Sequence, residues 1–238
     1  AGRYRQFTQF GFEALGSDDP LLDVEAITLP LELYQSCGLL GFEVEINTIG
    51  CPSCRSSYRQ ELIEYFEPHV EALCKSCQSR LHRNPMRLLD CKVESCQPVM
   101  EEAPHITEHL CQDCADHFDQ VLTLLDELGI TYKVNRRLVR GFDYYTRTVF
   151  EVTSSELGSQ NAIGAGGRYD GLVEELGGKP TAAVGFAVGV ERLLLALKSQ
   201  DKLQVESQGP EAYLVQFGGA TKLKAAQVAH FLRGQGLW

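Results

Sequence analysis

Apolar and polar positions at the start of the chain predict a strand, a helix and a second strand in turn. Residues 3 to 13 alternate bulky and polar side chains, a period of two that is typical of a strand with one polar face. The polar run at 17–19 before Pro20 predicts a helix start, and apolar positions continue to Cys37. Residues 42 to 47 alternate again as FEVEIN. We expect the polar face of the first strand to line a site.

Strand signals are absent from residue 51 to about residue 128. Helical stretches such as YRQELIEYFEPHVEAL and HFDQVLTLLDEL frame loops that are rich in Cys and Pro. This pattern predicts a separate helical module. Five further elements are predicted in order: strands at 131–135 and 137–154, a short helix at 170–176, a strand at 182–188 and a helix at 190–198.

A polar, aperiodic stretch from 199 to 210 reads as a linker and predicts a domain boundary. After it, EAYLVQF and KLKAAQVAHFLRGQG predict one strand and one helix, which together would open an α/β unit. The chain begins at Ala1 without a Met and ends at Trp238. We therefore expect the natural polypeptide to be longer.

Composition limits the classes of function. A chain of 238 residues with 44% hydrophobic content can bury a substantial core. No run of 18 apolar residues occurs and the first residues are polar, so we expect a cytoplasmic protein without a membrane partner. The net charge of −10 argues against field-driven binding of nucleic acid, although it leaves room for a local basic site.

Eight of the nine cysteines fall between residues 51 and 114, which indicates that they serve one local structural feature. Two C-x-x-C pairs can hold one tetrahedral Zn²⁺, so eight thiolates could hold two structural zinc ions, or four could hold one. Buried free thiols and disulfides are the competing interpretations, and an iron–sulfur cluster is a weaker one. The candidate ligands are Cys51 and Cys54, Cys74 and Cys77, Cys91 and Cys96, and Cys111 and Cys114.

Four separated segments resemble the histidyl-tRNA synthetase family in sequence, order and spacing: GRYRQFTQFGFEALG (2–16), LVRGFDYYTRTVFE (138–151), GAGGRYDGLVEELGG (164–178) and AVGFAVGVERLLLAL (183–197). RNPMRLLDCK (83–92) is similar to the insertion of that family. The resemblance implies an α+β fold of class II, an antiparallel sheet flanked by helices. It also implies ATP-dependent activation of L-histidine to histidyl-adenylate, with Mg²⁺, and transfer to the 3' end of tRNA(His) by a homodimer.

That chemistry needs fixed positive groups, because charge develops on the α-phosphorus when the histidine carboxylate attacks it. Arginine suits this role through its planar and permanently charged fork. Arg140, expected in a strand, matches the catalytic arginine of the family, which lies against the α-phosphate and the histidine carboxylate. Arg192 matches the arginine that contacts the γ-phosphate, and Gly189 allows ATP to approach closely. Without the resemblance, both arginines would be ordinary solvated side chains.

The resemblance also assigns the histidine pocket. Gln9 and Glu13 match its substrate-binding residues, with Glu13 as the partner of an imidazole N–H. Tyr144 and Tyr145 match tyrosines that close over histidine, and Tyr169 is a further member. Adjacent residues in a strand point to opposite faces, so we expect only one of Tyr144 and Tyr145 to be a direct ligand.

The predicted organisation is a catalytic core interrupted by a Cys-rich helical insertion: core at 1–50 and 129–199, insertion at 51–128, linker at 200–210 and the start of an anticodon-binding domain at 211–238. Arg3 and Arg5 are candidates for contacts with the tRNA acceptor end. We expect this piece to be inactive alone. Two alternatives stay open: a catalytically inactive, histidine-binding regulatory subunit, and a zinc-stabilised RNA-binding module.

Overall fold

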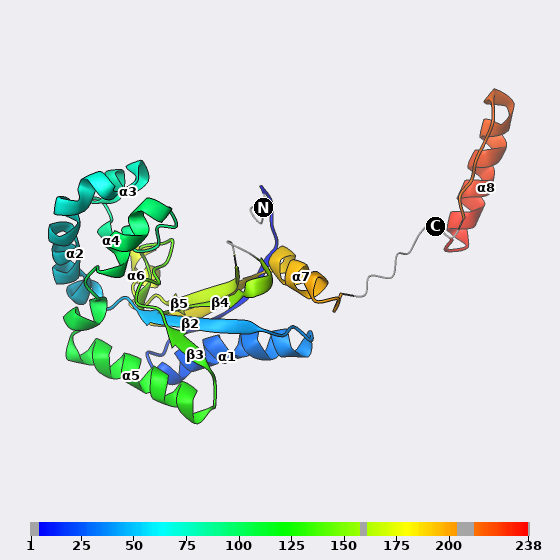
Figure 1. The fold of residues 1–238 in the computed structure, drawn as a ribbon. Helices are drawn as coiled ribbons and strands as arrows, with labels where there is room; N and C mark the ends of the chain where they lie inside the picture. The colour runs from blue at the N-terminus through cyan, green and yellow to red at the C-terminus, as the bar shows by residue number, and fades with distance from the viewer. Residues whose placement is uncertain (1–4, 158–160, 204–211, 238) are drawn as a thin grey trace. The chain divides into compact units, whose positions relative to one another are not determined.

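The computed structural model describes residues 5–157, 161–203 and 212–237, and the chain divides into a unit of residues 1–202 and a unit of residues 203–238 (Figure 1). The second unit contains helix α8, Lys222–Gly234. Residues 212–217 form no strand, so that prediction is wrong for the part described. A strand requires a hydrogen-bonded neighbour, and no sheet forms among the described residues of this unit.

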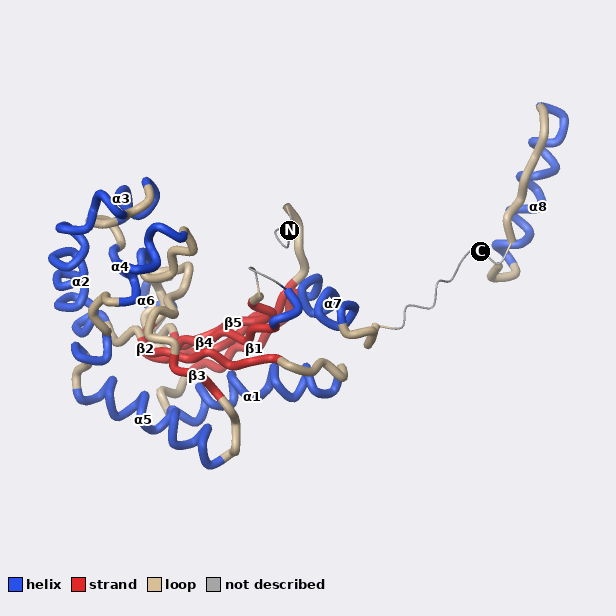
Figure 2. The backbone as a smooth tube through the Cα atoms, viewed as in Figure 1, coloured by secondary structure: helices blue, strands red, loops and turns tan. Residues whose placement is uncertain are grey.

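The first unit is built on a six-stranded sheet with the strand order β1-β6-β5-β4-β2-β3 (Figure 2). All neighbouring strands are antiparallel except β2 and β3, which pair in parallel over three residues. The expected antiparallel sheet therefore has one parallel edge. The strands are β1 (Gln9–Leu15), β2 (Phe42–Thr48), β3 (Tyr132–Val134), β4 (Thr146–Ser154), β5 (Ala162–Arg168) and β6 (Ala183–Gly189).

Helices of the first unit flank the sheet at one face and both ends. They are α1 (Pro20–Ser36), α2 (Pro52–Phe66), α3 (Lys75–Arg80), α4 (Gln97–Glu101), α5 (Gln112–Glu127), α6 (Leu172–Glu175) and α7 (Val190–Ser199). Short 3₁₀ turns occur at Glu67–Ala72, Pro85–Leu88, Glu94–Cys96, Ile106–His109, Ser155–Leu157 and Gly219–Thr221. None of the helices in the described residues is long and apolar enough to cross a membrane.

Helix α1 covers one face of the sheet and begins and ends as predicted. Asp19 is its N-cap and accepts a hydrogen bond from the N–H of Leu21 at 2.9 Å, and Gly38 ends it with a φ of +77°. The helix packs against β1, β5 and β6, and α5 lies beside it against β4 (Figure 1). The opposite face of the sheet is not covered by these two helices.

The helical insertion, α2 to α5, shares a hydrophobic core with the sheet. Buried side chains of the insertion, such as Tyr58, Leu62 and Leu88, belong to one cluster with Val139 and Val149 from the chain after it. The predicted helical character is confirmed. Its core, however, is continuous with that of the sheet, because its buried side chains pack on the residues that lead into β4.

Two expectations about strands are wrong. The strand expected at 137–154 begins only at Thr146, and residues 137–145 form turns, bends and irregular backbone instead. The glycine-rich stretch 162–168, for which no strand was expected, is β5 in the middle of the sheet. Glycine has a low intrinsic strand preference, but hydrogen bonds from β4 and β6 on both sides override it here.

Candidate active site

A cleft of about 700 Å³ opens on the sheet face opposite α1 and contains every residue predicted for the active site. These residues are Gln9, Glu13, Arg140, Tyr144, Tyr145, Tyr169, Gly189 and Arg192. They come from β1, the turn before β4, the end of β5, the end of β6 and α7. The sequence separates the first and the last of them by more than 180 residues, and the sheet topology brings them together.

Strand register explains the sheet wall of the cleft. Residues directly paired across antiparallel strands share a face, and Glu13 pairs with Gly185 while Gln9 pairs with Gly189. The partners of the two polar residues have no side chains, so the face stays open above them. At Gly185 the gap is required: an added Cβ would lie 1.9 Å from Oε2 of Glu13 and 2.4 Å from the carbonyl oxygen of Phe12.

Glu13 is the acidic group of this wall. The hydroxyl of Tyr169 donates a hydrogen bond to its carboxylate across the strands. Partial burial in the cleft raises the pKa of Glu13. A carboxylate held in this way can accept a hydrogen bond from a ligand N–H, which is the property that an imidazole-binding site needs.

Arg140 forms the cationic side of the cleft. Its Nη1 lies 2.5 Å from Oε1 of Glu151, and its guanidinium carbon lies 5.6 Å from the ring centroid of Tyr145. Burial raises the pKa of Glu151, against the opposing charge of Arg140. The Nε of Arg140 is buried and has no hydrogen-bond partner among the described residues. The Arg140 side chain lines the cleft and is 17% exposed, so its fixed positive charge can act on an anionic ligand there.

Aromatic rings enclose the space above Glu13. Tyr144 and Tyr145 have ring centroids 4.6 Å apart, and Tyr169 meets them edge to face at 5.8 and 6.2 Å. Burial raises the pKa of Tyr144 to about 12, so its hydroxyl stays a donor. Both adjacent tyrosines line the cleft. The expectation of opposite faces is wrong because they lie in a turn, where strand alternation does not apply.

The other end of the cleft is built around the start of α7. Nη1 of Arg192 donates to the carbonyl oxygen of Ala162 at 2.8 Å. The carboxylate of Glu191 accepts from the N–H of Thr8 at 2.8 and 3.0 Å, which ties the segment before β1 to α7. Gly189 precedes α7 at its N-cap. An N-terminal helix end with an arginine is a suitable environment for phosphate. Arg3 lies outside the described residues, and Arg5 is exposed.

A buried ion network lies behind the sheet wall. Nε of Arg168 donates to both carboxylate oxygens of Asp23 at 3.2 and 3.0 Å, and Nε2 of His117 lies 3.3 Å from Oδ2. Burial by itself would raise the pKa of Asp23, but hydrogen bonds and charges from His117 and Arg168 outweigh burial and lower it. Arg168 immediately precedes Tyr169, so this network fixes the end of β5 from which Tyr169 enters the cleft.

Side chains of the insertion hold the turn that carries Arg140, Tyr144 and Tyr145. Nη1 of Arg55 donates to the carbonyl oxygens of Asp143 at 3.2 Å and Tyr145 at 2.8 Å. Nδ2 of Asn84 donates to Oδ1 of Asp143 at 2.7 Å. Nη1 of Arg87 donates to the carbonyl oxygen of Arg140 at 2.8 Å. We call residues 138–145 the histidine loop, after the function that the sequence predicts for it.

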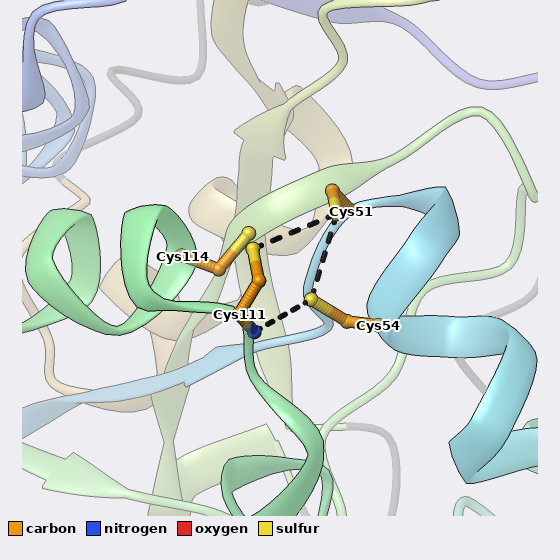
Figure 3. A group of neighbouring side chains, drawn as sticks. All are labelled: Cys51, Cys54, Cys111 and Cys114. Carbon is orange, nitrogen blue, oxygen red and sulfur yellow. Dashed lines mark hydrogen bonds between the residues drawn. The ribbon is translucent and has the colours of Figure 1, made fainter.

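The eight clustered cysteines assemble into two groups of four. We name Cys51, Cys54, Cys111 and Cys114 the junction cluster, and Cys74, Cys77, Cys91 and Cys96 the distal cluster. In each cluster the four sulfur atoms lie within 4.8 Å of one another. Figure 3 shows the junction cluster, in which the start of α2 faces the start of α5. All eight thiols are free in this structure, so no disulfide forms among them.

The sulfur positions fit a tetrahedral metal ion. A zinc ion with Zn–S bonds of about 2.3 Å spaces its thiolates about 3.8 Å apart. The Sγ–Sγ distances are 3.5 Å for Cys51 and Cys54, 4.0 Å for Cys51 and Cys111, and 3.9 Å for Cys74 and Cys91. A disulfide would need about 2.05 Å. The arrangement matches four ligands around one ion better than bridges.

Helix starts supply the thiolates with hydrogen-bond donors. Cys51, Cys74 and Cys111 are the N-cap residues of α2, α3 and α5. For Cys51, burial would raise the pKa, but hydrogen bonds from the backbone of Cys54 and Ser53 help lower it to about 6. For Cys74, the backbone of Cys77 is the main cause of a pKa near 7. Thiolates are the form that binds metal.

Sequence reasoning missed Glu151, Asp23 and His117. Glu151 is the last residue of the segment LVRGFDYYTRTVFE (138–151). A single carboxylate in a strand does not indicate which arginine it pairs with. Asp23 and His117 are separated by 94 positions in the numbering, and only the packing of α5 on α1 brings them together. The local sequence around either residue therefore does not predict that they pair.

Comparison with known proteins gives concordant matches. The family model described as histidyl-tRNA synthetase matches residues 1–193. The chain is 51% identical over 238 residues to a histidine–tRNA ligase of Halothermothrix orenii and 47% identical over 237 residues to one of Desulforamulus reducens. Each match covers 100% of this chain and 57% of the relative, so the chain spans somewhat more than half of their length.

Solved structures show the same likeness. A crystal structure of apo histidyl-tRNA synthetase from S. aureus matches with a TM-score of 0.67 and 36% identity, over 98% of this chain and 58% of that one. An ATP phosphoribosyltransferase regulatory subunit/histidyl-tRNA synthetase from Bacillus halodurans matches with a TM-score of 0.54 and 25% identity, over 97% of this chain and 61% of that one. The fold of the first unit is thus the α+β fold of these structures.

Proposed function

The chain belongs to the histidyl-tRNA synthetase family, and on that premise we propose that its cleft activates L-histidine with ATP as part of a histidine–tRNA ligase. The observation that carries the proposal is the convergence of all eight predicted site residues in one cleft. The reaction joins the histidine carboxylate to the α-phosphorus of ATP and releases pyrophosphate. The histidyl group then passes to the 3' end of tRNA(His).

Histidine lies at the Glu13 end of the cleft in this proposal. The carboxylate of Glu13, held by the hydroxyl of Tyr169, accepts the imidazole N–H, and Gln9 from the same strand face contributes a second polar group. The rings of Tyr144 and Tyr145 cover the ligand. A site that satisfies both ring nitrogens rejects amino acids without them, because its polar groups would otherwise stay unpaired.

ATP occupies the remainder of the cleft. Arg140, whose side chain lines the cleft, faces the α-phosphate and the histidine carboxylate, where charge develops during attack. Arg192 and Gly189, at the start of α7, face the γ-phosphate end. When bound, Mg²⁺ neutralises phosphate charge. Glu151 orients Arg140 through their ion pair.

Zinc is the metal that we assign to the cysteines of the insertion. Sets of four thiolates at tetrahedral spacing suit Zn²⁺, which needs no redox chemistry and serves structural sites. We further propose that the full-length protein is a cytoplasmic homodimer with tRNA(His) as its partner, that residues 1–50 and 129–199 form its catalytic core around the insertion 51–128, and that residues 211–238 begin its anticodon-binding domain.

Histidine-dependent exchange of pyrophosphate into ATP by the full-length protein tests the proposal. Arg140→Ala should lower the exchange rate by about a hundredfold or more, as expected for removal of a preorganised charge-stabilising donor. Arg136→Ala, at an exposed position four residues earlier, is the matched control and should retain exchange. A histidine-binding regulatory subunit would bind histidine without exchange, and exchange that survives Arg140→Ala would refute the role of Arg140.

A further inference from the structure

We infer that the junction and distal clusters each bind one zinc ion and that the metal-braced insertion positions the histidine loop. The inference rests on the proposed function, because it assigns a role in histidine binding to residues outside the cleft. Its first part concerns the pairing of the cysteines, which their spacing left open. Its second part concerns the contacts from the insertion to the loop.

The pairing follows from which helix starts meet. The junction cluster joins two C-x-x-C pairs that lie 60 residues apart in the chain and close the two ends of the insertion. The N–H of Cys111 also donates to Sγ of Cys54 at 3.1 Å, which locks the start of α5 onto the start of α2. The distal cluster joins α3 to the segment before α4 in the same way, with the N–H of Cys74 donating to Sγ of Cys96 at 3.2 Å.

These short helical pieces need the ions. Helix α3 has six residues and α4 has five, well below the length at which a helix is stable alone, which is about 12–15 residues. Between them the chain forms 3₁₀ turns and loops. A metal ion that binds four thiolates fixes such segments relative to one another and contributes directly to folding.

The contacts to the histidine loop begin next to the metal ligands. Arg55 follows Cys54 directly and donates to the carbonyl oxygens of Asp143 and Tyr145. Gln97 follows Cys96 directly and accepts from Nη1 of Arg137 at 3.1 Å, just before the loop. Each cluster thus places the residue after one of its ligands against the segment that enters β4.

Residues between the distal ligands hold the rest of the loop. Asn84 and Arg87 lie between Cys77 and Cys91, and they bind the side chain of Asp143 and the carbonyl oxygen of Arg140. The histidine loop itself has no strand or helix, so side-chain donors from the insertion satisfy its carbonyls instead of a backbone ladder. If the insertion loosens, the loop loses the contacts that aim Arg140 and the two tyrosines.

Metal content tests the first part. Native mass spectrometry of the full-length protein should find two zinc ions per chain. Cys111→Ser should remove one ion and leave one, and Cys111→His, which supplies another zinc ligand, should restore two. Cys37→Ser is the control, since Cys37 lies outside both clusters. A zinc count of zero or one in the unaltered protein would overturn the two-site assignment.

Arg55→Ala tests the second part without touching a metal ligand. It should keep two zinc ions and raise the histidine KM and Kd about tenfold, the effect expected when its hydrogen bonds to the carbonyl oxygens of Asp143 and Tyr145 are lost. The KM for ATP should change less, because the carbonyl oxygen of Arg140 is held by Arg87 and not by Arg55. Arg55→Lys should recover part of the loss. Arg59→Ala is the matched control on the same helix, because Arg59 binds the carbonyl oxygen of Arg83 inside the insertion.

The outcomes separate this inference from the proposed function. Two zinc ions with an unchanged histidine Kd in Arg55→Ala would overturn the positioning role and leave the ligase proposal intact. Absence of exchange in the unaltered protein would contradict the ligase proposal. The zinc content and the histidine Kd measured by titration calorimetry would still test the two parts of the inference. Equal loss of histidine and ATP affinity in Arg55→Ala would indicate general loosening and would also contradict positioning.

Discussion

The two walls of the cleft are held by different means. The sheet wall, with Gln9, Glu13 and Tyr169, is fixed by the hydrogen-bonded register of β1, β6 and β5 and by the buried network behind it. The histidine loop, with Arg140, Tyr144 and Tyr145, depends on side chains from an insertion that contributes no strand to the sheet. The comparison teaches that one cleft can combine a wall fixed by strand pairing with a wall positioned by side chains of an insertion.

The strongest way to break the sheet wall is through Asp23. Asp23→Asn leaves Arg168 buried with less opposing charge, and removal of one partner from a buried pair costs about 3–5 kcal/mol. We expect the free energy of unfolding, measured by urea denaturation, to fall by that amount. Asp18→Asn, at an exposed position of the same segment, should leave it unchanged. Equal stability of the two variants would show that the network contributes nothing.

Gly185→Ala should damage recognition at the same wall. Its Cβ would collide with the Glu13 carboxylate and with the backbone of Phe12, so the carboxylate must move. A misplacement of about 1 Å can cost about a hundredfold in rate, and we expect a loss of this size in kcat/KM for histidine in the exchange assay. Gly171→Ala, which meets only the end of Glu175 at 3.9 Å, is the control. An unchanged kcat/KM for histidine in Gly185→Ala would contradict the assignment of Glu13 to the pocket.

Low pH should destabilise the unaltered protein through the buried carboxylate of Asp23. The pKa of Asp23 is lower in the folded state than in the unfolded state. Its contribution to stability is therefore complete above the unfolded value of about 3.9 and is lost as the pH falls through the folded value. Urea denaturation from about pH 5 to about pH 2, which is from about one unit above the unfolded pKa to about two units below it, should show a steeper loss of stability for the unaltered protein than for Asp23→Asn. Parallel curves would contradict the lowered pKa.

The smallest effect is expected at the rim of the loop. Phe142 is 65% exposed and stacks on Tyr144 with centroids 5.3 Å apart. An aromatic pair contributes about 0.5–1.5 kcal/mol, and an exposed one belongs at the lower end, so Phe142→Ala should raise the histidine KM about two- to threefold. Phe142→Leu keeps apolar cover and should give a smaller rise. A tenfold or larger rise in Phe142→Ala would mean that the rim positions the loop as strongly as Arg55 does.

The sequence predicted several separate strands and helices better than the histidine loop for a physical reason. Period-two patterns and helix caps are local signals, and they predicted β2, α1 and α7 close to their observed limits. The histidine loop has strand-like residues, but its conformation depends on donors from Arg55, Asn84 and Arg87 far away in the chain. The motif resemblance predicted that Arg140, Tyr144 and Tyr145 line the site, and it gave no information on the conformation of the loop that carries them.

The cysteines show the same limit in another form. The C-x-x-C spacing predicted metal ligands, and it is silent about which pairs meet, because that depends on how α2, α3 and α5 pack. The structure pairs 51/54 with 111/114 and 74/77 with 91/96. The glycine-rich strand β5 was not predicted for a related reason. Pairing with β4 and β6 stabilises it, whereas its own residues have a low strand preference.

Amino-acid dependence of pyrophosphate exchange by the full-length protein tests the central claim most directly. The account predicts exchange with histidine and none above background with glutamine. Glutamine offers Glu13 an amide N–H, but it does not fill the space beneath Tyr144 and Tyr145 that the imidazole ring of histidine would occupy. Absence of exchange with histidine, or equal exchange with both amino acids, would contradict the claim that this cleft recognises and activates histidine.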